Sequence, residues 1–187
     1  IPTDYSHTIG AIQAAGDGTL WVTAGDGSAT PAATRRSLRT FDERSYAGKL
    51  LHIDRNGRGL RGHPFCPGER DLRRVCTKVF AMGFRNPFRF SLAPDGTPIV
   101  GDVGWGSREE IDLVQAGRNY GWPCYEGQIR TPGYDAFRAC RRLYAREGSP
   151  GAAEPPAYEY ASSDGGAVIA GPLFPESAVP PFRDAFF

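Results

Sequence analysis

Short apolar or alternating stretches follow one another along the chain, and turn-forming residues separate them. Such runs are typical of β-strands, since helices need longer segments with a period near 3.6 residues. The clearest expected strands are residues 48–54, 77–81, 88–92 and 110–114. Residues 35–44 alone have a pattern that allows a short helix. The pattern therefore predicts an all-β fold.

One pattern recurs along the chain: an Asp-Gly turn, a short apolar strand and a further glycine close behind. It is clear at Asp17 and Asp95, and a fainter copy begins at Asp164. Asp-Gly suits a tight turn because glycine adopts positive φ angles at no steric cost and aspartate can bond the turn backbone. A repeat of about 70 to 80 residues is too long for helical repeats and suits a four-stranded propeller blade with one long loop.

Composition and charge narrow the class of protein. The 24 glycines and 16 prolines suit a fold with many tight turns. A formal net charge of +1 produces no strong field, so we expect no binding to nucleic acid or to an anionic membrane. No stretch approaches the roughly 18 apolar residues of a membrane-spanning helix. The chain starts at Ile1 and stops within an apolar run, so we expect one partial domain over residues 1–187, truncated at both ends.

The four cysteines form two local groups, Cys66 with Cys76 and Cys124 with Cys140, each in loop-like sequence. Neither group has the Cys-x-x-Cys spacing of a zinc or redox site. An even number of cysteines in loops predicts two disulfides and a secreted, periplasmic or extracellular location. The alternative is four unpaired buried thiols in a cytosolic protein.

The densest group of candidate catalytic residues lies near the start of the chain. His7 precedes an apolar strand, an Asp-Gly turn and a second strand, after which Gly25-Asp26-Gly27 follows. Histidine titrates near neutrality, and a carboxylate partner orients the ring and raises its basicity. The alternative is that His7 is an ordinary polar residue near a chain end and Asp26 forms a turn.

Three further segments carry candidate chemistry. Residues 82–87 read Met-Gly-Phe-Arg-Asn-Pro, and residues 101–106 read Gly-Asp-Val-Gly-Trp-Gly. Residues 117–127 are rich in glycine and aromatic side chains. Large aromatic residues commonly supply core area, so we expect these to fill the space between blades: Tyr120, Trp122 and Tyr125.

In order and spacing these motifs resemble the soluble glucose/sorbosone dehydrogenase family, whose members are aldose sugar dehydrogenases dependent on pyrroloquinoline quinone (PQQ). The resemblance implies a six-bladed β-propeller of which this chain carries about two to three blades. It also implies a calcium ion that binds beside the quinone. The implied general base and its orienting partner are His7 and Asp26, the quinone contacts are Arg85 and Asn86, and the main-chain carbonyls toward calcium belong to Gly104 and Trp105.

The resemblance further implies an activity, namely oxidation of the C1 hydroxyl of an aldose to a lactone by hydride transfer to PQQ. A sugar and an external electron acceptor would be the partners. One alternative is a non-enzymatic carbohydrate- or protein-binding propeller, such as that of the hedgehog-interacting protein. Another is a calcium-dependent lactone hydrolase, which needs more converging carboxylates than the pair Glu109-Glu110 supplies.

Residues 57–62 match the glycine pattern Gly-x-Gly-x-x-Gly of dinucleotide-binding proteins. That fingerprint needs a helix N-terminus directly behind the glycines, and His63-Pro64 cannot begin a sustained helix. We therefore expect no nicotinamide site here. His52 and His63 have no companions at metal-ligand spacing, and we interpret them as a strand residue and a loop residue.

Overall fold

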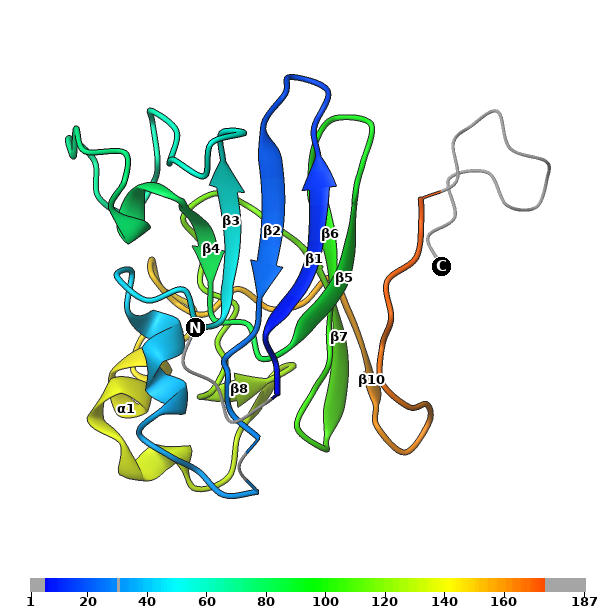
Figure 1. Cartoon of the computed structure of the whole chain (residues 1–187). Helices are drawn as coiled ribbons and strands as arrows, with labels where there is room; N and C mark the ends of the chain where they lie inside the picture. Colours follow the sequence, from blue (N-terminus) through cyan, green and yellow to red (C-terminus); the bar gives the residue numbers. More distant parts are fainter. Residues whose placement is uncertain (1–5, 30, 174–187) are drawn as a thin grey trace.

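The computed structural model describes residues 6–29 and 31–173 and contains two four-stranded antiparallel sheets that lie side by side (Figure 1). The first sheet consists of β1 (Ile9–Ala14), β2 (Leu20–Ala24), β3 (Lys49–Ile53) and β4 (Val79–Met82). The second consists of β5 (Pro87–Leu92), β6 (Pro98–Asp102), β7 (Arg108–Leu113) and β10 (Tyr158–Ala161). Strands that follow one another pair within each sheet, except that β10 joins β7 after a long insertion. This arrangement is that of two consecutive propeller blades, and it confirms the all-β prediction.

The expected strands are present within two residues of their predicted bounds, because alternating polarity records which face of a strand is buried. The side chains of Asp17 and Asp95 each accept a hydrogen bond from the backbone two residues on, at 2.9 Å, and close the turns β1–β2 and β5–β6. The third copy of the repeat was predicted wrongly. Asp164 lies in a turn after β10, and no strand follows it before residue 173.

The main core lies between the two sheets, where strand β1 of one sheet contacts strand β5 of the other. The rings of Phe84 and Tyr120 stack there with centroids 5.0 Å apart, and the Tyr120 hydroxyl donates to the carbonyl of Leu113 at 2.8 Å. Tyr120 therefore fills space between blades, as expected. The buried members of this core are Trp21, Leu50, Ala81, Phe84, Phe90, Val100, Val114 and Tyr120.

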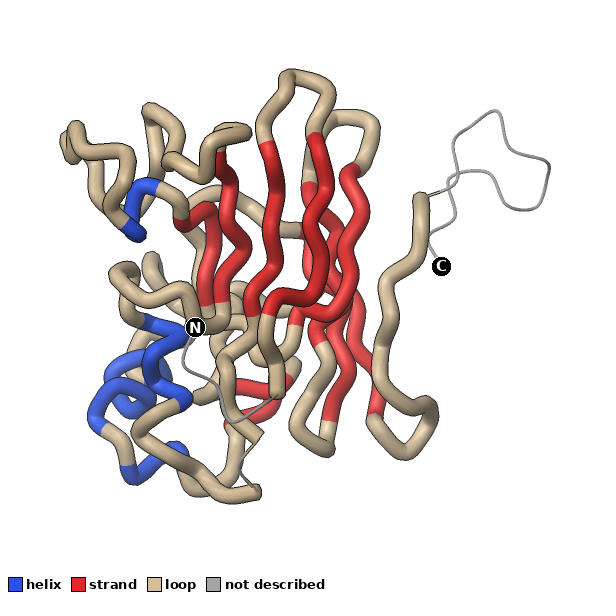
Figure 2. Tube along the Cα trace, viewed as in Figure 1, coloured by secondary structure: helices blue, strands red, loops and turns tan. Residues whose placement is uncertain are grey.

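Helical segments gather mainly at one end of the sheets, where β1 begins and β2 ends (Figures 1 and 2). The short helix expected within residues 35–44 is the 3-10 helix η1 (Ser37–Phe41). The insertion after β7 holds β8 (Tyr125–Glu126), β9 (Ile129–Arg130), η3 (Tyr134–Ala136) and α1 (Arg138–Tyr144).

The sequence pattern did not predict α1, and that is a correction. A helix of seven residues is too short to be stable alone or to show a clear period, so packing decides that it forms. Its buried side chains, Cys140, Leu143 and Tyr144, pack against Tyr125 and Tyr134.

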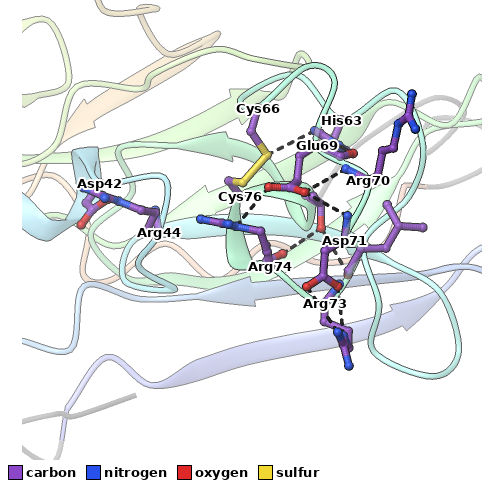
Figure 3. The surroundings of a disulfide bond; sticks show 12 residues. Asp42, Arg44, His63, Cys66, Glu69, Arg70, Asp71, Arg73, Arg74 and Cys76 are labelled. Atoms are coloured by element: carbon purple, nitrogen blue, oxygen red, sulfur yellow. Dashed lines mark hydrogen bonds and ion pairs between the residues drawn. A yellow bond between two sulfur atoms is a disulfide. The ribbon is translucent and has the colours of Figure 1, made fainter.

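Both predicted disulfides are present, and no free cysteine remains in the described part of the chain. Cys66–Cys76 braces the long loop between β3 and β4 (Figure 3). The ion pairs beside it, Arg74 to Glu69 at 3.2 Å and Arg73 to Asp71 at 3.0 Å, are largely exposed and contribute little to stability. Cys124–Cys140 ties α1 to the segment before β8. The short 3-10 helix η2 (Val75–Thr77) lies at the end of this loop, directly before β4.

The glycine pattern at residues 57–62 lies in this same loop and is followed by turns, not by a helix. It therefore offers no helix N-terminus to a dinucleotide, as expected. Within residues 6–29 and 31–173, no helix has the length and apolar character needed to cross a lipid bilayer.

Candidate active site

The hairpin of β1 and β2 brings His7 and Asp26 together, because one precedes β1 and the other follows β2. Backbone hydrogen bonds continue past the strand ends, from Gly25 N to Thr8 O at 2.8 Å and from Gly27 N to His7 O at 3.2 Å. The His7 Nδ1 lies 2.8 Å from the Asp26 Oδ1. The side chains are 10% and 1% exposed, so the pair is largely shielded from water.

The Asp26 carboxylate accepts three hydrogen bonds. Oδ1 accepts from His7 Nδ1 and from Ser28 N, the latter at 2.9 Å, and Oδ2 accepts from Trp122 Nε1 at 2.8 Å. Because the other contacts of this carboxylate are with N–H donors, we assign the hydrogen of the His7–Asp26 contact to Nδ1. Within the described part of the chain, no group hydrogen-bonds Nε2. In this tautomer, Nε2 is the ring nitrogen without a hydrogen.

The backbone at His7 adopts a φ of 48°, in the left-handed region that costs a non-glycine residue energy. Such strain persists only where surrounding contacts impose it, and it is frequent at active sites. Gly25 supplies part of the constraint, since a Cβ there would collide with the main chain and side chain of His7.

The turn between β4 and β5 places Arg85 beside this dyad. The Arg85 carbonyl accepts from Asp26 N at 2.8 Å, which joins the two predicted parts of the site directly. Asp102 holds the turn, because its carboxylate accepts from Arg85 N at 2.8 Å and from Asn86 N at 2.6 Å. The side-chain amide of Asn86 has no hydrogen-bond partner among the described residues, so it can contact a ligand.

The Gly104 loop after β6 lies against the Arg85 guanidinium. Nη1 of Arg85 donates to the carbonyls of Val103, at 2.9 Å, and of Gly104. A Cβ at Gly104 would overlap the carbonyl oxygen of Arg108, so only glycine fits. The six residues that the motifs singled out thus lie at one end of the sheets, and their chemical roles remain predictions.

Glu126 shapes this loop, and the sequence reasoning missed it. Its Oε1 accepts from the backbone N–H groups of residues 105–108 at 2.6 to 3.2 Å, and the side chain is buried. Converging backbone donors form a concave site that suits an anion. An acidic residue inside an otherwise aromatic and glycine-rich segment was the available signal.

Trp122 is the second residue whose role was missed. Beyond filling space, its indole nitrogen donates to Asp26, its ring lies 5.5 Å below the Arg85 guanidinium, and it contacts the Trp105 ring with centroids 6.0 Å apart. A buried tryptophan usually needs an acceptor for its N–H. That need was the signal in the sequence that Trp122 could bond a carboxylate of the site.

Burial governs the electrostatics of this end of the sheets. Burial lowers the pKa of Arg85 below its usual value, although the carboxylates of Asp26 and Asp102 oppose this, and the guanidinium stays charged at neutral pH. Burial also raises the pKa of Asp102 to about 7, although the backbone hydrogen bonds from Arg85 and Asn86 lower this pKa. Burial and then Asp112 raise the pKa of Glu110 well above its usual value.

Asp112 is the extreme case, because it is fully buried and both carboxylate oxygens lack a hydrogen-bond partner in the described structure. Burial, followed by the nearby Asp102, raises the pKa of Asp112 well above its usual value. An acid whose pKa rises on folding costs nothing below its unfolded pKa near 4 and destabilises the fold progressively as the pH rises toward its folded pKa.

We therefore expect Asp112→Asn to stabilise the protein with a defined pH dependence. Urea unfolding at about pH 4 should give nearly the same free energy as the unsubstituted protein, and the variant should be more stable than the unsubstituted protein near pH 7. Asp135→Asn, at an exposed aspartate, is the matched control and should change neither value. A destabilised Asp112→Asn at pH 7 would contradict the prediction and show that the charged carboxylate has a favourable partner.

Comparison with known proteins agrees with the motifs. A family model described as Glucose / Sorbosone dehydrogenase matches residues 2–174. The chain belongs to this family. Quinoprotein glucose dehydrogenase B of Acinetobacter calcoaceticus is 27% identical over 146 residues, which are 72% of this chain and 29% of that protein.

Two solved structures show that the family's propeller fold is shared. The PQQ-bound aldose sugar dehydrogenase of Streptomyces coelicolor matches 92% of this chain with a TM-score of 0.63 and 21% identity. The apo-form soluble aldose sugar dehydrogenase of Escherichia coli matches 97% with a TM-score of 0.67 and 21% identity. The chain spans 40% and 47% of those two chains, so it is similar to part of each propeller.

Proposed function

We propose that this chain contributes the catalytic base and part of the cofactor site of a quinoprotein that oxidises the C1 hydroxyl of an aldose to a lactone. The observation that carries the proposal is the His7–Asp26 dyad, which leaves Nε2 of His7 available and is joined through Asp26 N to the carbonyl of Arg85. Membership of the glucose/sorbosone dehydrogenase family supports the reaction class.

In this proposal His7 acts as the general base. Its Nε2 removes the proton of the anomeric hydroxyl as the C1 hydride leaves, and the imidazolium that results is stabilised by the Asp26 carboxylate. Asp26 also keeps the ring in the one tautomer that can accept this proton. PQQ, when bound, supplies the two-electron acceptor for the hydride.

The residues present suit a quinone whose oxygens gain negative charge on reduction, and a hard cation. The fixed donors of Arg85 and the free amide of Asn86 can bind quinone or carboxylate oxygens. Calcium takes carbonyl ligands. The Trp105 carbonyl accepts no hydrogen bond from the described residues, whereas the Gly104 carbonyl accepts one from Arg85 and would exchange it for the cation. Within those residues, no three His, Cys, Asp or Glu side chains gather to hold a metal. In this proposal the bound cofactor therefore supplies some of the ligands of the cation.

The partners in this proposal are an aldose and an external electron acceptor that reoxidises the cofactor. Two disulfides favour an oxidising compartment, and we propose a secreted or periplasmic location.

Reconstitution tests the function. The full gene product that contains this chain should bind PQQ in the presence of Ca²⁺, with a change in the absorbance of the cofactor, and should then reduce an artificial dye when an aldose is added. Chelation of Ca²⁺ with EDTA should abolish dye reduction, and added Ca²⁺ should restore it. Absence of cofactor uptake with intact folding would refute the proposal and favour a propeller that only binds ligands.

A further inference from the structure

We propose that Trp122 is a positioning residue that locks the orientation of the Asp26 carboxylate and couples the His7–Asp26 dyad to Arg85. This inference rests on the proposed function for its catalytic consequence, whereas the contact itself stands on geometry. Sequence spacing assigns Trp122 no such role, since 96 residues separate it from Asp26.

The indole N–H completes the hydrogen bonding of the carboxylate. Ser28 and His7 bond Oδ1, and Trp122 Nε1 is the donor that the described structure provides to Oδ2, at 2.8 Å. With donors on both oxygens, rotation of the carboxylate would break at least one bond. Because Asp26 is 1% exposed, water does not readily replace a lost donor. Trp122 therefore fixes the plane in which Asp26 meets Nδ1 of His7.

Trp122 can impose this orientation because it is itself held from several sides. Its backbone N donates to Gly83 O at 2.9 Å, and its carbonyl accepts from the Thr40 hydroxyl at 2.7 Å. Its ring makes edge contacts with the rings of Trp105 and Tyr134, with centroids 6.0 Å apart in both cases. A side chain that is 5% exposed and fixed in this way loses little entropy when it orients its neighbour.

The same indole also contacts the cofactor side of the site. The Arg85 guanidinium carbon lies 5.5 Å from the ring centroid, in the range of cation–π attraction. A carboxylate that accepts from the indole N–H raises the electron density of the ring and so strengthens its attraction for a cation. The hydrogen bond to Asp26 and the contact with Arg85 therefore support each other.

Substitution with Trp122→Phe in the full gene product tests the catalytic consequence, because it keeps a smaller aromatic ring and deletes the N–H. We expect kcat for dye-linked aldose oxidation to fall about tenfold, in line with the loss of a charge-assisted hydrogen bond, while KM for the sugar changes less than about twofold. The matched control is Trp21→Phe, at an equally buried indole that stacks on His52 away from the site and should keep kcat. Wild-type kcat in Trp122→Phe would overturn the role.

A spectroscopic test leaves Trp122 in place and needs no activity. This chain has three tryptophans, so three of the indole ¹H–¹⁵N signals of the full gene product belong to it. Asp26→Asn replaces the charged acceptor with a neutral one, and the Trp122 indole proton should move upfield while the Trp21 signal stays. An unmoved Trp122 signal would overturn the contact and with it the proposal.

These readouts separate the two proposals. If the unsubstituted protein shows no PQQ-dependent sugar oxidation, the proposed function fails, and the indole signal alone decides whether Trp122 holds Asp26. If the unsubstituted protein is active and Trp122→Phe is equally active, the positioning role fails and the proposed function stands.

Discussion

Replacing His7 with alanine is expected to lower kcat/KM for PQQ-dependent aldose oxidation by about a thousandfold, the usual contribution of a positioned general base. The reason is that Nε2 of His7 is the basic atom that the Asp26 dyad leaves free. Because cofactor contacts are assigned to Arg85 and Asn86, PQQ uptake by His7→Ala should stay within about threefold of the unsubstituted protein. Steady-state dye reduction and absorbance titration with PQQ measure the two quantities.

The control for this experiment is His63→Ala. His63 lies in the loop between β3 and β4 that Cys66–Cys76 braces, and this loop leaves the end of β3 that is opposite to the start of β1 (Figure 1). Its substitution should leave dye reduction unchanged. Turnover by His7→Ala at the rate of the unsubstituted protein would exclude His7 as the base, whatever its distance from Asp26.

The second large effect is expected for Gly104→Ala. A methyl group at this position would overlap the carbonyl oxygen of Arg108, and relief requires the loop to move. The carbonyls of Val103 and Gly104 would then turn away from Arg85. We expect the affinity for PQQ with Ca²⁺ to fall by about a hundredfold and the free energy of unfolding by about 2–4 kcal/mol, as for overpacking against rigid backbone.

Gly106→Ala is the matched control, because a Cβ at Gly106 meets no atom within 4 Å and the residue lies in the same loop. It should bind the cofactor and unfold like the unsubstituted protein. Equal cofactor affinity in Gly104→Ala and Gly106→Ala would show that the carbonyls of Val103 and Gly104 do not contribute to cofactor binding. Thermal unfolding and absorbance titration of both variants distinguish these results.

The candidate site is built from segments that flank the ends of strands, and the sheets set the spacing between these segments. Four segments bring the chemistry together: the segment before β1 with His7, the segment after β2 with Asp26, the β4–β5 turn with Arg85, and the Gly104 loop after β6. Buried carboxylates shape two of them, because Asp102 holds the Arg85 turn and Glu126 holds the Gly104 loop. A loop held by a rigid sheet can vary its side chains without loss of the fold. Functional residues therefore commonly lie on such loops.

Features that depend on neighbours in sequence were predictable. The turns at Asp17 and Asp95 follow from local backbone preferences, and the disulfides join cysteines only 10 and 16 residues apart. The approach of His7 to Asp26 belongs to the same class, since one hairpin joins these two residues, which are 19 positions apart. The family motifs supplied Arg85 as a further site residue, but not the hydrogen bond that joins it to Asp26.

Features that depend on packing between distant segments were not predictable. The helix α1 forms because its apolar side packs on other parts of the insertion, not because of its own sequence. Asp112 is a charged residue type that is usually exposed, yet it is fully buried.

By itself, the sequence determined the all-β class, the two disulfides and the family, and it predicted the residues for acid–base and cofactor chemistry. These follow from side-chain type, alternation and short spacing, which a linear pattern records. Only the tertiary structure decided that Trp122 bonds Asp26 and that Glu126 gathers four backbone amides, because hydrogen-bond partners in a buried site are set by which strand ends meet in space.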